Sequence, residues 1–384
     1  MHSASSLSLA LMLAVGASAQ NYSYLSSLNQ QLTTMGLYSL VDAINSIQST
    51  NAGQRLFSQL DNTEQLFFAP NEGAFNGEFW NVSSDPELLA NVLSYHVLPG
   101  NFDTTQNYPN TTIGRTLLGQ SSGLTFLEGN RNQALAWSNT DGDTRILNQN
   151  TEVKVVGQGN FDKLTIRVID AIIDLPGPFS WAVDANNLYS FQDALQNAGL
   201  YDTLNSMRGV TIFAPTDDAF NSVQQNLDSL SNNYAEMSAI LNNHYIAGDS
   251  VYTGNFQGGM RPYSAGGEQY SSSFNQNGQY ITMGNVTARI VTPDIILENG
   301  VLHVIDHVFL NDQVNQGAAS SFASSASSAA TASTTMTGPI GYTPTSSNGS
   351  SSAANGRIEI PLRAFGLSAL LGALGVVAGT MLVL

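Results

Sequence analysis

A nine-residue pattern that occurs twice constrains the fold of this chain more than any other feature. Residues 212–220 read IFAPTDDAF, and residues 67–75 read FFAPNEGAF. Each copy places an apolar, strand-like run before a proline, which cannot continue a central ladder, and then a polar residue, Thr216 or Asn71, that can cap a helix. Two copies of one β-to-α junction predict that the chain is built from two versions of one module.

Three further segments repeat in the same order around this pattern. The first is an early helical segment, at residues 37–44 and 188–195. The second is a segment with a histidine, at residues 91–100 and 239–248. The third is a closing β-branched run, at residues 168–173 and 304–309. The closing run predicts a strand that is buried on both faces. Between the histidine segment and the closing run both copies alternate polar with apolar residues, which predicts hairpins, one of them with its turn at Asp141 and Gly142. Helices that come early and strands that come late predict an α+β module with a mainly antiparallel sheet.

The ends of the chain carry signals of secretion and of lipid attachment. Residues 1–19 combine a short apolar run with a small-residue cleavage site, which is typical of a signal peptide. Residues 356–384 provide a spacer and an uncharged apolar tail after a small-residue stretch, as in a GPI-attachment signal, and Ala354 or Asn355 is expected to accept the lipid. A retained transmembrane helix over residues 365–384 is the alternative.

Between these signals we expect two folded modules and a stalk. Module 1 is predicted over residues 22–176 and module 2 over residues 180–311, with a Pro-rich boundary between them. Residues 313–355 are rich in Ser, Ala and Thr, so we expect a low-complexity, disordered and extended stalk suited to O-glycosylation. Sequons for N-glycosylation occur at five asparagines: Asn21, Asn81, Asn110, Asn285 and Asn348.

Charge and cysteine content exclude several classes of function. The chain has 12 Lys and Arg against 29 Asp and Glu, a net charge of −17. Nucleic acid is therefore not expected as a partner, because phosphate contacts need a basic surface. The chain has no cysteine, which removes disulfides, thiolate catalysis and cysteine-based zinc sites. We expect no cofactor.

Two motifs that could indicate catalysis or metal binding do not fit their surroundings. Residues 119–123 match the G-x-S-x-G of a nucleophile elbow, but a strand is expected at residues 123–127 where the elbow needs a helix. We interpret the motif as a hairpin turn. His303 and His307 would share one face of a strand, but no further ligand accompanies them. The sequence therefore predicts neither a catalytic site nor a metal site.

The repeated residues resemble a known family, the fasciclin domains. Residues 211–220 are similar to the first signature of that family, residues 299–308 are similar to the second, and Tyr95-His96 resembles the Tyr-His motif between them. The resemblance covers about residues 22–311 and is closest in module 2. It implies an extracellular, often GPI-anchored protein that mediates adhesion between cells or to matrix and wall.

The resemblance also implies candidate interaction residues. In animal members of the family, Asp-Ile and Tyr-His segments have been tied to integrin binding. The matching positions, with the histidine of module 2, are Tyr95, His96, His244, Asp294 and Ile295. The alternative that we favour is structural: Ile295 in the core, Asp294 fixing a turn and His96 hydrogen-bonded in a helix.

These observations predict a secreted, GPI-anchored, non-enzymatic surface protein of the fungal type. Its tandem modules would bind a cell-surface, wall or matrix protein or a glycan, with weak contacts strengthened by repetition. Two alternatives stay open: a wall-matrix structural protein that binds polysaccharide, and a hydrolase on the same scaffold. The sequence leaves the oligomeric state open.

Overall fold

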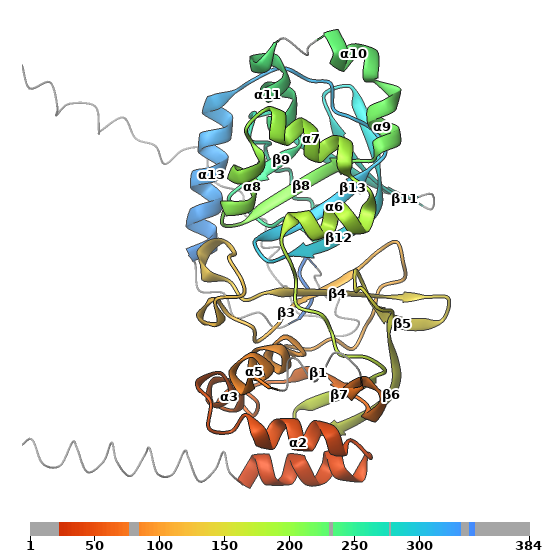
Figure 1. Ribbon diagram of the computed structural model, residues 1–384, viewed down its shortest axis with the longest axis vertical. Coiled ribbons are helices and arrows are strands. Elements are labelled where there is room, and N and C mark those ends of the chain that lie inside the picture. Colours follow the sequence, from red (N-terminus) through yellow and green to blue (C-terminus); the bar gives the residue numbers. More distant parts are fainter. Residues whose placement is uncertain (1–22, 77–83, 230–232, 276–277, 332–337, 342–384) are drawn as a thin grey trace, which may run out of the picture. The chain divides into compact units, whose positions relative to one another are not determined.

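The structure is a computed structural model that describes residues 23–76, 84–229, 233–275, 278–331 and 338–341 (Figure 1). All described residues belong to one compact unit. Within this unit two modules follow each other along the chain, and each packs helices on one mixed sheet. The predicted α+β class and the two modules are confirmed.

In module 1 a helix over residues 23–34 precedes the named elements. The helices and short 3-10 turns are α2 (Tyr38–Ser46), α3 (Asn51–Phe57), η1 (Glu72–Phe75), α5 (Pro86–Tyr95), η2 (Gln120–Ser122) and η3 (Glu128–Asn130). The strands are β1 (Gln65–Pro70), β2 (Val97–Pro99), β3 (Thr112–Arg115), β4 (Ala134–Thr140), β5 (Asp143–Ile146), β6 (Val153–Phe161) and β7 (Leu164–Ile169).

Module 2 repeats this plan. Its helices are α6 (Phe179–Asn186), α7 (Tyr189–Asn197), α8 (Tyr201–Ser206), α9 (Asp217–Ser222), α10 (Gln224–Ser229), α11 (Tyr234–Asn242) and α12 (Thr253–Gln257). Its strands are β8 (Val210–Pro215), β9 (Tyr245–Ala247), β10 (Tyr270–Asn275), β11 (Gly278–Met283), β12 (Val286–Leu297) and β13 (Gly300–Ile305).

Four strands have the same order and directions in both sheets. The order β2-β1-β7-β6 in module 1 corresponds to β9-β8-β13-β12 in module 2. In each set the two central strands are parallel, β1 with β7 and β8 with β13, and the neighbouring pairs are antiparallel. Every residue of β1, β8 and β13 is buried, as expected for strands covered on both faces.

The β-to-α junction that marks each module forms as predicted. Thr216 caps α9, because its hydroxyl accepts a hydrogen bond from the N–H of Ala219 at 3.1 Å. The acidic residue that follows has a second role, since Asp217 Oδ1 accepts from the N–H of Ser190 at the start of α7, at 2.9 Å. In module 1, Glu72 accepts from Ser39 in the same way, so the junction also fixes the early helix.

The closing strands end earlier than the β-branched runs predict. β7 ends at Ile169 and β13 at Ile305, and an aspartate follows each of them. The carboxylates of Asp170 and Asp306 accept hydrogen bonds from backbone N–H groups of the neighbouring strands, both at 2.7 Å. A side chain thus takes over the acceptor role at the strand end, and the ladder stops there.

One predicted hairpin is present and one is not. Asp141 and Gly142 connect β4 to β5, and both have positive φ (54° and 92°), as a two-residue hairpin turn requires. The strand expected at residues 123–127 does not form. Instead the N–H of Phe126 donates to the carbonyl of Glu298 in module 2, at 2.8 Å, so this segment packs across to the other module.

The core lies on both faces of each sheet and continues from one module into the other. Two apolar clusters belong to module 1 and two to module 2. A fifth cluster combines Ile113, Ala134 and Ala136 of module 1 with Tyr252 and Val301 of module 2, all nearly or fully buried. Burial of this apolar surface favours close docking of the modules.

Part of the predicted stalk is a packed helix. Within residues 313–355, which were expected to be extended, residues Gln316–Thr331 form helix α13. Asn315 caps it, since its side chain accepts from the N–H of Ala318 at 3.0 Å. Ala326 and Ala330 lie one turn apart on the buried side, where their small side chains allow close approach. The expectation of an extended stalk is therefore wrong for α13, and it stays a prediction beyond residue 341.

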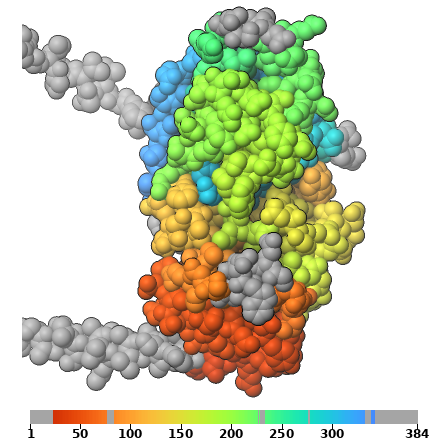
Figure 2. All heavy atoms as spheres, in the orientation of Figure 1, coloured from red at the N-terminus to blue at the C-terminus, as the bar shows by residue number. Residues whose placement is uncertain are grey.

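Helix α13 touches both modules. The Phe322 ring lies 6.2 Å from the Tyr263 ring of module 2. At the far end of the helix, Ala330 lies against Gly129 of module 1. A Cβ atom added at residue 129 would stand only 2.2 Å from the Ala330 carbonyl oxygen. Figure 2 shows the atoms of α13, in blue, against the light-orange atoms of this part of module 1. Among the residues that the structure describes, no helix has both the length and the apolarity to cross a membrane.

We expect leucine at position 330 to detach α13 from module 1. Overpacking of a close contact typically costs about 1–3 kcal/mol, so local opening should rise about tenfold in A330L. Limited proteolysis between residues 312 and 343 measures this opening. The matched control is A329L, because Ala329 is exposed on the same helix. Equal cleavage rates in the two variants would contradict the contact with Gly129.

Candidate functional site at the junction of the two modules

His96 and His244 occupy equivalent, fully buried positions in the two modules. His96 Nδ1 lies 2.8 Å from the Val92 carbonyl oxygen, and Nε2 accepts from the N–H of Ile173 at 3.0 Å. His244 bonds the carbonyl four residues earlier and the N–H of Phe309 in the same way. Because a backbone N–H can only donate, Nε2 must be unprotonated, and each ring is neutral.

This arrangement ties the end of a helix to the segment after the closing strand. Burial away from water lowers the pKa of His96 and of His244 to about 4, partly offset by the hydrogen bond to the helix carbonyl. Tyr95 is also buried, and its hydroxyl donates to the Ala134 carbonyl at 2.9 Å. The geometry of all three side chains supports the structural alternative over direct contact with a partner.

Asp294 is fully buried and connects the two modules. Its Oδ1 accepts from the N–H of Thr253 at 2.9 Å, and its Oδ2 accepts from the hydroxyls of Thr253 and of Thr111, which belongs to module 1. Its carbonyl accepts from the Asn148 side chain, also of module 1, at 2.9 Å. Its φ of 53° lies in the left-handed region, which Asp tolerates better than most residues. Ile295, the next residue, lies in the core of module 2.

A neutral histidine completes this cluster. His303 Nδ1 accepts from the N–H of Asp294 at 3.2 Å, and Nε2 lies 3.0 Å from the Val251 carbonyl oxygen. Burial lowers the pKa of His303, and the nearby Asp294 carboxylate opposes this shift. A buried carboxylate is costly unless hydrogen bonds replace its water. Docking of module 1 supplies one of these hydrogen bonds, from the Thr111 hydroxyl. Asp294 therefore couples the two modules energetically.

Contrary to the prediction from their spacing, His303 and His307 do not share one face of a strand. β13 ends before His307, whose exposed side chain bonds Asp306 at 2.7 Å, whereas His303 points into the junction. Within the described residues, no group of three or more possible ligands could hold a metal ion.

A second polar cluster lies at the same junction. Glu128 of module 1 is buried, accepts from the Ser250 hydroxyl of module 2 at 2.8 Å, and pairs with Arg131 at 2.7 Å. Arg131 also reaches Asp249 at 3.6 Å. The pKa of Asp249 is raised to about 6, first by burial and then by the negative charge of Glu128, while Arg131 opposes the shift. Two independent sets of polar contacts thus fix the modules against each other.

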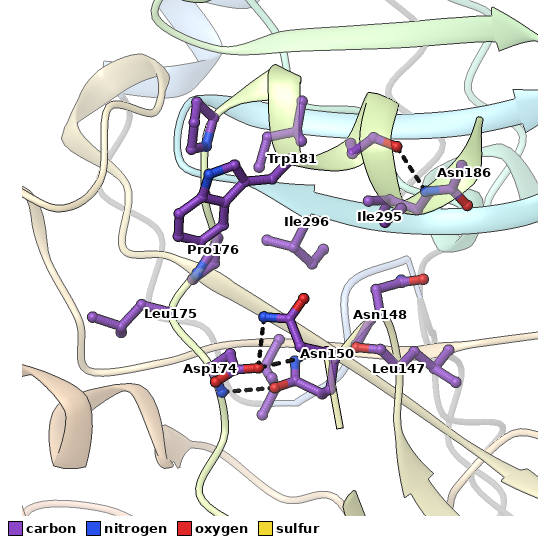
Figure 3. A pocket seen from close by; sticks show the side chains of 18 of the residues that line it. Leu147, Asn148, Asn150, Asp174, Leu175, Pro176, Trp181, Asn186, Ile295 and Ile296 are labelled. Carbon is purple, nitrogen blue, oxygen red and sulfur yellow. Dashed lines mark hydrogen bonds between the residues drawn. The ribbon is translucent and has the colours of Figure 1, made fainter. Parts of the chain in front are cut away.

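A groove opens beside this junction (Figure 3). It has a volume of about 240 Å³ and takes its walls from the β5–β6 loop of module 1, the Pro-rich boundary segment, α6 and β12. Trp181 of α6 stands at its edge with 58% of its surface exposed. Both modules and the boundary segment contribute to this concave surface.

Two of the predicted sequons lie in the described residues. Asn285 is exposed in the turn between β11 and β12. Asn110 is half-buried, and its Oδ1 accepts from Gln257 at 2.9 Å and from Gln279 at 3.0 Å, both in module 2. The other predicted modification positions lie outside the described residues: Asn21, Asn81, Asn348, Ala354 and Asn355.

Comparison with known proteins gives the family. The model of the fasciclin domain matches residues 42–176 and again residues 186–311. The chain belongs to the fasciclin domain family. The two matches correspond to the two structural modules, so the resemblance seen in the sequence is confirmed.

Fungal proteins are among those similar to this chain. The chain is 25% identical over 226 residues to a "Fasciclin-like arabinogalactan protein" of Arthroderma benhamiae, which covers 59% of this chain and 52% of the relative. It is 25% identical over 248 residues to "Fasciclin-like arabinogalactan protein elcF" of Phaeosphaeria nodorum, covering 63% and 76%. The chain thus spans about half the length of the first relative. A solved FAS1 domain pair from the insect cell adhesion molecule Fasciclin I is 14% identical, with a TM-score of 0.35, and covers 76% of this chain and all of that one.

Sequence reasoning missed most of the residues that build the junction. Thr111, Thr253 and Glu128 carry no local pattern, and their partners in the other module lie more than 100 residues away. Trp181 did carry a signal: it is one of only three tryptophans and follows directly after the Pro-rich boundary. A large aromatic residue beside an expected linker is a candidate for a shared surface.

Proposed function

We propose that this chain is an extracellular, non-enzymatic adhesion protein whose two fasciclin modules act as one rigid binding body. The observation that carries the proposal is the junction, where a shared apolar cluster and the buried Asp294 hold the modules together. A fixed arrangement presents one continuous surface to a partner. Binding then costs no entropy for ordering the modules relative to each other. Family membership and the fungal fasciclin-like relatives favour this class of function.

The chemistry of the histidines supports a non-enzymatic role. His96, His244 and His303, three of the four histidines in the described residues, use both ring nitrogens for hydrogen bonds with the backbone. They are buried and therefore not available as general bases for a substrate at the surface. Ser121, in the G-x-S-x-G motif, lies in the 3-10 turn η2 without the strand-to-helix elbow of a hydrolase.

Secretion and lipid anchoring complete the proposal. A signal peptide over residues 1–19 and lipid attachment at Ala354 or Asn355 would place the protein on the outer surface of the cell. A phosphatidylinositol-specific phospholipase should then release the intact protein from cells. Retention, with a known GPI-anchored control released, would favour a transmembrane anchor instead.

Display of the full chain on animal cells in suspension tests the adhesion function. The proposal predicts that displaying cells attach to one another, or to wall and matrix preparations, above cells that display an unrelated anchored protein. Attachment should disappear when the phospholipase removes the protein. Absence of attachment at a surface level confirmed by antibody staining would overturn the proposal.

A further inference from the structure

The groove between the modules combines an aromatic platform with polar acceptors. In Figure 3, Trp181 and Ile296 of module 2 lie on one side, and Asn148, Asn150 and Asp174 lie on the other. An exposed aromatic side chain thus lies opposite a wall that carries three polar side chains, with Leu147 and Leu175 beside them. This composition matches ligand sites in general, which pair hydrophobic and aromatic walls with a few placed polar groups.

The Trp181 indole is exposed but held in place. Its six-membered ring lies against the backbone of Gly177. A Cβ atom added at residue 177 would stand 2.0 Å from Cε3 of Trp181. Only glycine at residue 177 allows this position of the ring. Among the described residues the indole N–H has no hydrogen-bond partner, although such groups usually find one when a ligand covers them.

The polar wall keeps acceptors free. Oδ2 of Asp174 accepts from the N–H and the side-chain Nδ2 of Asn150, at 3.3 and 3.1 Å, which fixes both side chains. Within the described part of the chain, Oδ1 of Asp174 and Oδ1 of Asn150 accept no hydrogen bond from the protein. They are exposed and ordered by each other, so they can receive hydroxyl groups of a ligand.

We propose that this groove binds one ring of a neutral polysaccharide. A pyranose ring has an apolar C–H face that can stack on an indole, and a rim of hydroxyl groups that can donate to Asp174 and Asn150. No Lys or Arg lines the groove, so it offers nothing to neutralise phosphate, sulfate or uronate groups. Its volume of about 240 Å³ lies below the ~300–1,000 Å³ of sites that enclose a drug-sized ligand, which suits one ring of a longer chain.

This inference rests on the proposed adhesion function and names the chemical class of the partner. Because both modules and the boundary segment form the walls, the site exists only while the junction is intact. That dependence gives the rigid arrangement a direct purpose in recognition.

Binding of fluorescently labelled hexasaccharides to the full chain, purified in detergent, tests the proposal. The probes are linear hexasaccharides of glucose, mannose and N-acetylglucosamine, with hexagalacturonate as the charged comparison. Fluorescence anisotropy should show that at least one neutral probe binds more tightly than hexagalacturonate. W181A should weaken that binding at least about tenfold, since loss of aromatic stacking and of buried ring area acts together.

The matched control is Y38A, because Tyr38 is also 58% exposed but lies on α2, away from the groove. It should leave the affinity unchanged. N150A and G177A provide independent tests that keep the Trp181 side chain, and both should weaken binding. Urea unfolding of each variant separates loss of the site from loss of the fold.

The proposal is overturned if no neutral probe binds the wild type, if W181A binds as tightly as Y38A, or if excess choline displaces the probe. The last result would indicate a cation site instead. Any of these outcomes together with normal attachment in the cell assay removes the saccharide site and leaves the adhesion function standing. Loss of attachment in the wild type would remove the adhesion function itself.

Discussion

Replacing Asp294 by alanine is expected to lower the free energy of unfolding by about 4 kcal/mol at pH 7. The variant D294A loses three hydrogen bonds to a charged acceptor, each worth about 1.5–3 kcal/mol, and this loss is partly offset because the buried charge disappears. Alanine also tolerates the positive φ of this position less well than aspartate. Urea unfolding of the full chain measures the change.

Two variants separate the causes. D141A removes an exposed aspartate that has nearly the same positive φ, 54°, and should cost only about 1 kcal/mol of backbone strain. T111V removes only the hydroxyl that crosses from module 1 and should cost about 1–2 kcal/mol. An effect of D294A no larger than that of D141A would show that the buried cluster does not stabilise the protein.

Acidification is expected to destabilise the protein through His96 and His244. In the unfolded chain a histidine titrates near pH ~6.5, whereas the folded pKa of each is about 4. Between these values the unfolded state binds more protons, so the free energy of unfolding falls as the pH falls. The expected loss is about 1.4 kcal/mol per pH unit for each histidine, or about 3 kcal/mol each by pH 4.

Asp249 acts in the opposite direction. Its folded pKa, about 6, lies above the ordinary value of 3.8, so its contribution to stability is present at low pH and is lost as the pH rises toward 6. Counting the three groups together, the unfolded state binds about one proton more than the folded state between pH 4.5 and 6. The free energy of unfolding therefore still rises toward neutral pH. The two histidines therefore outweigh Asp249, and the protein is expected to be most stable above pH 6.

Unfolding of H244Q in urea at pH 5, 6 and 7 tests this account. The variant should be less stable at pH 7, because glutamine cannot reproduce both backbone contacts, and its pH slope should be smaller than that of the wild type by about 1.4 kcal/mol per unit. H307Q is the control, since His307 is largely exposed. An unchanged slope in H244Q would mean that folding does not lower the pKa of this histidine.

Local sequence signals were sufficient to predict the modules. The Phe-Ala-Pro junction combines a buried strand, a proline and a cap at Thr216, and each of these acts through neighbouring residues. The same holds for the turn at Asp141 and Gly142. Such features depend on the backbone preferences of a few neighbouring residues, and these preferences can be read from the sequence.

The junction between the modules could not be predicted in this way. Thr111 and Asp294 meet across 183 positions, and no periodicity links them. Residues 123–127 have a strand-like pattern, but the N–H of Phe126 donates to Glu298 of module 2 and no hairpin forms there. Helix α13 was missed because its composition is that of a disordered segment, whereas Ala330 is small enough to pack against Gly129, which lies far away in the sequence.

The central claim is that the two fasciclin modules fold and act as one body. Scanning calorimetry of the wild-type full chain at pH 7 tests it most directly. The shared cluster around Tyr252 and the Asp294 contacts predict a single cooperative transition, with a calorimetric enthalpy equal to the van't Hoff enthalpy. Two separate transitions, with one module unfolding while the other stays folded, would contradict the claim.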